Sequence, residues 1–210
     1  LCMENHDRYL EILWGCQFAG LVYTAASSRL TSNELTYILN DCQAKAFITS
    51  KYKADQAIEI SNDIPNVHLR LMIDGTVDGY DSFESTVDSA STLPLPDMVD
   101  GTDMLYSSGT TGMPKGVLWR NADAVVECFG GSKTARTIEE FVTEAAGNFR
   151  ALPSPPFMHG AGHWIAMRTW LTGGTIIVQS QPDRLDADDI WGLIEKEKAN
   201  FLLIVGDAFA

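Results

Sequence analysis

Long apolar runs and clusters of basic residues are both missing from the sequence. No apolar run approaches the ~18 to 20 residues of a membrane span, and no basic stretch precedes an apolar one as in a signal peptide. The chain has 15 Lys and Arg against 28 Asp and Glu, so its net charge is −13. An acidic surface repels phosphate backbones, which argues against nucleic-acid binding by a broad basic face, so we expect no nucleic acid as a partner. A polyphosphate ligand would need a locally built anion site.

Cysteine is sparse and lacks metal-binding spacing. The chain has four cysteines, at positions 2, 16, 42 and 128, and none forms a C-x-x-C pair. No Cys or His cluster has the spacing of zinc ligands, which argues against a structural zinc site. The cysteines are therefore interpreted as buried free thiols in a reducing compartment, and we expect a cytoplasmic protein.

The composition is that of a globular protein. With 210 residues, 45% of them hydrophobic and 20% charged, the chain is neither disordered, collagen-like nor a coiled coil. Its length suits one or two domains. It begins at Leu1 without an initiating Met, and it ends shortly after an apolar, strand-like run at 201–205. We therefore expect a piece of a longer protein.

Helical and strand patterns alternate in the first third of the chain. Apolar spacing predicts helices near 7–18 and 53–60, and a Thr31–Glu34 capping box begins another helix between them. Strands are predicted at 21–23, 46–48 and 67–73. This order predicts an α/β fold with a parallel sheet covered by helices. Residues 75–100, rich in Ser, Asp, Thr and Pro, predict a surface connection and a possible subdomain break.

The remainder continues the α/β pattern. Two strands, 104–106 and 117–119, flank a polar glycine-rich loop. Further strands are predicted at 149–152, 175–178 and 201–205, and helices near 122–129, 138–146, 161–171 and from Asp186 or Asp188 through 196. The fold class is therefore α/β, with layered sheets covered by helices.

The loop between Tyr106 and Val117 carries the clearest chemistry. Its sequence, Tyr-Ser-Ser-Gly-Thr-Thr-Gly-Met-Pro-Lys-Gly-Val, holds four Ser and Thr hydroxyls, three glycines and a lysine. Glycines let backbone amides approach an anion, hydroxyls donate to phosphate oxygens, and lysine adds positive charge. A Walker A loop would need Gly-Lys-Ser/Thr opening a helix, whereas Pro114 and Gly116 flank Lys115 here. A flexible hairpin without a ligand is the structural alternative.

This loop closely resembles the signature of the adenylate-forming superfamily, which includes acyl-CoA synthetases, peptide-synthetase adenylation domains and firefly-type luciferases. The Pro-Pro-Phe-Met-His run at 155–159 resembles the superfamily's second core motif, and 173–175 the turn that follows. The stretches 116–120 and 205–210 are similar to the fatty-acyl-CoA synthetase branch. The resemblance implies that residues 1–210 are part of the large N-terminal domain of an AMP-dependent synthetase/ligase.

The resemblance also implies a reaction. Such enzymes use ATP and Mg²⁺ to convert a carboxylic acid, here a fatty or other hydrophobic acid, to an acyl-adenylate and pyrophosphate. Coenzyme A then accepts the acyl group as a thioester, so the parent is expected to be an acid–thiol ligase. The motifs for adenine, the hinge and the late catalytic lysine lie further along in the family, so these 210 residues alone are expected to be inactive.

The resemblance also implies which residues form the site, from the positions that match the family's motifs. The resemblance implies that the β- and γ-phosphates are held by Ser107, Ser108, Gly109, Thr110, Thr111, Gly112 and Lys115. Thr111 is the expected metal contact, and His159 matches a position near the acyl carboxylate, so Lys115 and His159 are the expected catalytic residues. Taken alone, His159 is typical of a core or capping histidine. A metal pair with His163 is disfavoured, because Gly160 and Gly162 weaken a helix there and no H-E-x-x-H pattern is present.

Other functions remain open at this point. The acyl group could pass to another acceptor, as in an adenylation domain or a luciferase-like enzyme. A truncated, non-catalytic nucleotide-binding protein would keep the loop and bind ATP without forming an adenylate. A Walker-type NTPase is disfavoured by Pro114 and Gly116.

Overall fold

The computed structural model describes residues 1–96, 99, 101–107, 113–118, 137–145, 149–181 and 184–206. The chain divides into two compact units, which are described separately. Unit 1 comprises Leu1–Glu4 and Leu13–Trp119, and unit 2 comprises Asn5–Ile12 and Arg120–Ala210. Helix α1 (Arg8–Phe18) runs across the boundary at residue 12. The expected subdomain break near 75–100 stays a prediction.

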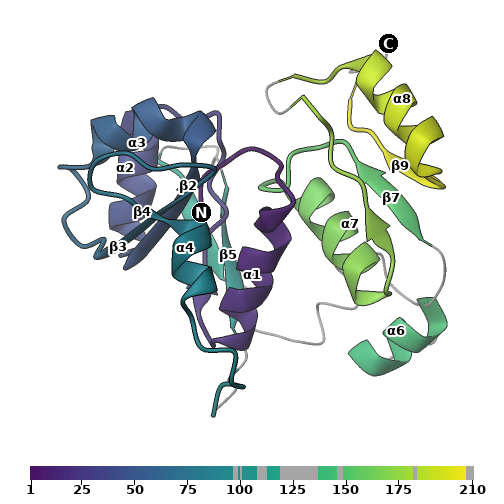
Figure 1. Ribbon diagram of the computed structural model, residues 1–210, viewed down its shortest axis with the longest axis horizontal. Coiled ribbons are helices and arrows are strands. Elements are labelled where there is room, and N and C mark those ends of the chain that lie inside the picture. The colour runs from purple at the N-terminus through teal and green to yellow at the C-terminus, as the bar shows by residue number, and fades with distance from the viewer. Residues whose placement is uncertain are drawn as a thin grey trace. The chain divides into compact units, whose positions relative to one another are not determined.

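Unit 1 holds two sheets within the described ranges. After α1 its elements are β1 (Val22–Tyr23), α2 (Ser32–Asp41), β2 (Ala46–Ser50), η1 (Lys51–Lys53), α3 (Ala54–Ile60), β3 (Leu69–Ile73), β4 (Asp81–Ser82), α4 (Phe83–Asp88), β5 (Thr102–Ser107) and β6 (Lys115–Leu118). Strands β2, β3 and β4 form a parallel sheet, seen with α2 and α3 in Figure 1. Strand β5 pairs in parallel with β1 and antiparallel with β6.

The pairing of β1 corrects the expectation that the first three strands form one parallel sheet. Strand β1 joins β5 instead of β2, with Val22 opposite Thr102. The close approach of two chain segments fixes this partner. The Gly101 amide donates to the Gln17 carbonyl at 2.8 Å, and a Cβ on Gly101 would lie 2.6 Å from the carbonyl oxygens of Cys16 and Leu21. A glycine is therefore needed where the chain enters β5.

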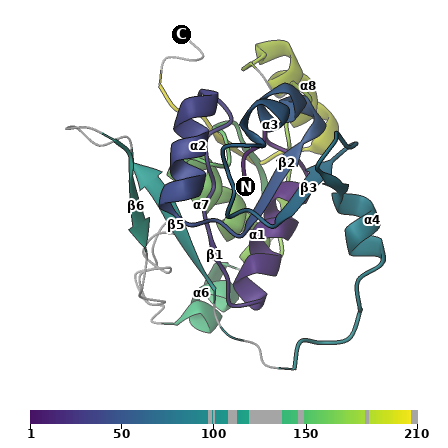
Figure 2. The ribbon, with the colours of Figure 1, turned by 90° about the vertical axis from the view of Figure 1, so that its left-hand side faces the viewer.

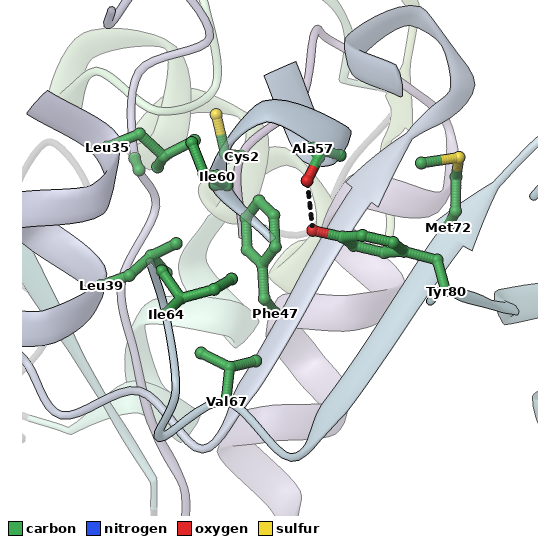
Figure 3. Packing of buried hydrophobic residues seen from close by; sticks show 11 residues of the cluster. Cys2, Leu35, Leu39, Phe47, Ala57, Ile60, Ile64, Val67, Met72 and Tyr80 are labelled. Atoms are coloured by element: carbon green, nitrogen blue, oxygen red, sulfur yellow. Dashed lines mark hydrogen bonds between the residues drawn. The ribbon is translucent and has the colours of Figure 1, made fainter. Parts of the chain in front are cut away.

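The core of unit 1 lies between β2, β3 and the two helices α2 and α3. Leu35 and Leu39 of α2, Ile60 of α3, and Phe47 of β2 belong to one buried cluster, shown in Figure 3. The Phe47 ring packs edge-on against Tyr80, with centroids 6.2 Å apart. Burial of this apolar surface is the main stabilising contribution in the unit.

The predicted capping box begins α2. The Glu34 amide donates to the Thr31 hydroxyl at 3.4 Å, and the Glu34 carboxylate accepts from the Thr31 amide at 2.8 Å. These bonds satisfy two amides that the first helical turn leaves without partners. The Thr31 amide, and next the Thr31 hydroxyl, donate to the Glu34 carboxylate and lower its pKa. This predicted helix start is confirmed.

Unit 2 is a three-stranded parallel sheet with helices among its described residues. Its elements are α6 (Ile138–Ala145), β7 (Arg150–Pro153), α7 (Gly160–Leu171), β8 (Thr175–Ile176), α8 (Ala187–Glu197) and β9 (Phe201–Leu203). Strand β7 lies between β8 and β9. Its buried Leu152 packs with Ile177 and with Ile190 of α8. Asp186 caps α8 by accepting from the amides of residues 188 and 189.

These elements confirm the α/β fold class and most predicted helices and strands. The helix expected near 122–129 lies outside the described residues. None of the helices in the described ranges has the length and apolar character of a bilayer-crossing helix. Cys2 is buried, and Cys16 and Cys42 are half-buried, all three as free thiols. Cys128 lies outside the described part of the chain.

Candidate functional site

The β5–β6 hairpin holds both ends of the glycine-rich loop. In its register, Ser107 lies opposite Lys115 and Tyr106 lies opposite Gly116. Facing residues of an antiparallel pair project to the same face of the sheet. Both Ser107 and Lys115 are exposed. The structure thus brings together the first hydroxyl and the lysine of the predicted phosphate site.

The middle of this loop lies outside the described residues. That segment contains the predicted phosphate ligands Ser108, Gly109, Thr110, Thr111 and Gly112. It also contains the predicted metal contact, Thr111. In the described ranges, no group of three or more His, Cys, Asp or Glu side chains could hold a metal ion.

Gly116 lets β6 approach the side chains of β5 closely. A Cβ at this position would lie 3.0 Å from the Met104 sulfur and 3.2 Å from a ring carbon of Tyr106. Both distances are tighter than ordinary van der Waals contact. The glycine after Lys115 therefore has a packing role as well as any role toward an anion.

Helix α2 contacts both arms of this hairpin. The Tyr106 hydroxyl donates to Asp41 Oδ2 at 2.5 Å, and the Tyr37 hydroxyl donates to the Pro114 carbonyl at 3.2 Å. Burial, and next the bond to Asp41, raise the pKa of Tyr106 above its usual range, so its hydroxyl stays protonated at neutral pH. Sequence analysis missed Tyr37 and Asp41. Their i, i+4 spacing places them on one side of α2, but this spacing does not indicate the groups to which they bond.

His159 lies at the start of α7 in unit 2. It is the N-cap residue, with extended backbone angles of φ −98° and ψ 141°. Its amide donates to the Pro156 carbonyl at 3.0 Å, and its carbonyl accepts from the His163 amide at 2.9 Å. The imidazole is exposed and makes no capping bond. The side chain thus lies at the surface of unit 2, and the backbone that carries it is fixed by hydrogen bonds of both its amide and its carbonyl.

Asn5 braces the segment before His159. Its Nδ2 donates to the Pro155 carbonyl at 3.3 Å, and its Oδ1 accepts from the Phe157 amide at 2.6 Å. The Phe157 ring is fully buried and packs edge-on against Tyr9, with centroids 5.5 Å apart. Sequence analysis missed Asn5, because no local pattern relates it to a segment 150 residues away.

Helix α7 begins at Gly160 despite its two early glycines. A Cβ on Gly162 would lie 2.5 Å from the carbonyl oxygens of Pro155 and Pro156. This glycine therefore allows the first turn of α7 to pack against the preceding segment. His159 is exposed and His163 is buried. The two histidines thus lie in different environments, although they are four residues apart on a helix.

The large apolar residues near His159 belong mostly to the core. Phe157, Met158 and Met167 are buried, which favours packing over an acyl pocket. Trp170 and Phe157 help to line a hollow of about 220 Å³ in unit 2. Ligand pockets usually have volumes of ~300 to 1,000 Å³. We therefore assign no acid to this hollow.

The buried His163 predicts a pH dependence of stability. Burial lowers the pKa of His163 to about 4, whereas an unfolded histidine titrates near 6.5. Between these values the unfolded chain binds a proton that the folded chain does not, so stability is present above pH 6.5 and is lost toward pH 4. We expect this residue to lower the free energy of unfolding by roughly 2 kcal/mol between pH 7 and pH 5.

Denaturant unfolding of the full-length protein at several pH values measures this effect. The variant His163→Gln should flatten the pH profile on the acid side. The matched variant His68→Gln, at an exposed histidine, should keep the wild-type profile. Equal profiles for wild type and His163→Gln would contradict the prediction.

The fold is that of part of the N-terminal domain seen in solved structures. Our structure matches the inhibitor-bound N-terminal domain of FACL13 from Mycobacterium tuberculosis with a TM-score of 0.78 and 22% identity, covering 99% of this chain and 49% of that one. It matches the long-chain-fatty-acid-CoA ligase FadD1 from Archaeoglobus fulgidus with a TM-score of 0.79 and 19% identity, covering 99% and 39%. These likenesses establish the architecture.

Sequence comparison gives the family. All of residues 1–210 match the AMP-binding enzyme family, and the chain belongs to it. It is 34% identical to the medium-chain acyl-CoA ligase Mig of Mycobacterium avium, covering 98% of this chain and 40% of that protein. It is 29% identical to a medium/long-chain-fatty-acid and 3-oxocholest-4-en-26-oate CoA ligase of Mycolicibacterium smegmatis, covering 100% and 40%. The chain thus spans about 40% of the length of these relatives.

Proposed function

We propose that the full-length protein carrying this chain is an acid–thiol ligase. It activates a fatty or other hydrophobic carboxylic acid with ATP and transfers the acyl group to coenzyme A. The observation that supports this best is the pairing of Ser107 with Lys115 at the base of the loop, in a chain matching the AMP-binding family throughout. Relatives named as medium- and long-chain acyl-CoA ligases support the substrate class.

In the first step, a carboxylate oxygen bonds to the α-phosphorus of MgATP. The bond from the α-phosphorus to the oxygen bridging to the β-phosphorus breaks, and pyrophosphate leaves with added negative charge. Ser107, Ser108, Gly109, Thr110, Thr111, Gly112 and Lys115 are proposed to hold the β- and γ-phosphates. A lysine ammonium and fixed donors stabilise such developing charge, and positioning contributes most of the remaining acceleration.

In the second step, the sulfur of coenzyme A bonds to the acyl carbon. The bond from that carbon to the AMP oxygen breaks, and the thiol proton is released. His159 is proposed to lie beside the acyl carboxylate. Its imidazole is exposed, and both its backbone amide and its backbone carbonyl are hydrogen-bonded. Such a residue can meet a ligand in a fixed geometry. Thr111 is proposed to contact the Mg²⁺ that accompanies the nucleotide.

The organisation of the whole protein is part of the proposal. Residues 1–210 are proposed to form part of a large N-terminal domain, with a subdomain break near 75–100, in a cytoplasmic enzyme. The family's adenine, hinge and late lysine motifs would then lie outside this chain.

Isotope transfer tests the proposed reaction. The full-length protein is incubated with MgATP and fatty acids of several chain lengths labelled with ¹⁸O in the carboxylate. With coenzyme A present, we expect one ¹⁸O atom in the AMP released and none in the pyrophosphate. Without coenzyme A, labelled acyl-adenylate should accumulate. Hydrolysis of ATP to ADP, or AMP without label, would contradict the proposal.

A further inference from the structure

One side of α2 holds the two ends of the loop. Tyr37 and Asp41 are four residues apart, so they lie one above the other on this helix. Tyr37 donates to the carbonyl of Pro114, the residue before Lys115. Asp41 accepts from the hydroxyl of Tyr106, the residue before Ser107. Figure 2 shows α2 beside β5 and β6.

These contacts are separate from the part of α2 that builds the core. Leu35, Ile38 and Leu39 are the buried residues of the helix. Tyr37 is half-buried and Asp41 is exposed. The helix therefore has a core-facing side and a second side that bonds to the hairpin.

We propose that Tyr37 and Asp41 are positioning residues that fix the base of the nucleotide loop. The inference rests on the proposed function. Ser107 of β5 and Lys115 of β6 are paired in the hairpin. A shift of either strand would therefore move both residues relative to the phosphates. The bond to Pro114 holds one arm, and the bond to Tyr106 holds the other. Fixed groups stabilise developing charge better than mobile ones.

Tyr37→Phe tests the first contact, because it removes only the hydroxyl. In the full-length protein we expect kcat/KM for MgATP in the adenylation half-reaction to fall about 3- to 10-fold. Thioester formation from supplied acyl-adenylate should stay within about twofold of wild type, because that step does not use the β- and γ-phosphates. A residue that only stabilises the fold would not change one half-reaction selectively.

Tyr80→Phe is the matched control. The Tyr80 hydroxyl donates to the Ala57 carbonyl at 3.2 Å, the same chemistry and distance as Tyr37 to Pro114 (Figure 3). This bond joins two residues of the buried cluster, whose members include none from β5 or β6. Tyr80→Phe should lower the melting temperature and leave the ratio of the two half-reactions unchanged.

Asp41 is tested by two substitutions. Asp41→Ala should lower the adenylation half-reaction about 10-fold, because the Tyr106 hydroxyl loses a charged acceptor. Asp41→Asn keeps an acceptor oxygen and should restore most of the rate. Asp41→Ala combined with Tyr106→Phe should be no slower than the slower single variant, because both changes remove one bond.

The outcomes separate this inference from the proposed function. A wild-type protein that transfers no label from any acid overturns the proposed function, and the inference with it. An active wild type in which Tyr37→Phe behaves like Tyr80→Phe, or in which Asp41→Asn is as slow as Asp41→Ala, overturns the inference alone.

Discussion

Replacing Lys115 by alanine should slow the adenylation half-reaction by about two to three orders of magnitude. Lys115 begins β6 opposite Ser107, and its side chain is exposed at the base of the loop. In the proposed reaction its charge opposes the negative charge that develops on the leaving pyrophosphate. Pyrophosphate–ATP exchange in the full-length protein measures this step.

The second half-reaction is the internal reference for this prediction. Thioester formation from supplied acyl-adenylate should change little in Lys115→Ala, since pyrophosphate has already left. The matched variant Lys196→Ala removes an exposed lysine of α8 and should leave both steps at the wild-type rate. Equal loss in both half-reactions would show that Lys115 has a structural role.

Gly162→Ala should lower the free energy of unfolding by about 3 kcal/mol. The new methyl group would lie 2.5 Å from the carbonyl oxygens of Pro155 and Pro156, and backbone atoms cannot move aside as a flexible side chain does. The start of α7 or the segment that Asn5 braces must shift. Because His159 lies between them, we also expect a lower adenylation rate. Thermal and denaturant unfolding measure the change in stability.

Gly192→Ala is the control for this substitution. Gly192 is also a helical glycine, in α8, but a methyl group added there would have no described atom of a neighbouring segment within 4 Å. Alanine should therefore stabilise the protein by up to about 1 kcal/mol through its higher helix propensity. A melting temperature of Gly162→Ala equal to that of wild type would contradict the packing account of α7.

Local patterns were enough to predict most elements. The apolar spacing of α1 and α3 and the capping residues Thr31 and Asp186 act within a few residues, so they can be read from the sequence. The partner of β1 could not be read in this way. Its pairing with β5 depends on a close backbone approach at Gly101, far along the chain. The apolar pattern of a short strand does not identify the strand with which it pairs.

Part of the candidate site could likewise be predicted from the sequence, and part could not. The hydroxyls, glycines and lysine of the loop form a contiguous pattern, and the structure pairs its two ends, Ser107 and Lys115. Asn5 and Tyr37 could not be predicted, because each bonds to backbone groups, which every residue has. When a side chain bonds to a backbone group, the sequence contains no complementary side chain that would indicate the partner.

Hydrogen exchange with MgATP tests the central claim most directly. Amide exchange in the full-length protein is measured with and without the nucleotide. If residues 107–115 hold the triphosphate, their amides should exchange more slowly when MgATP is bound, and Lys115→Ala should weaken that protection. Nucleotide binding with protection elsewhere and none in 107–115 would contradict the account.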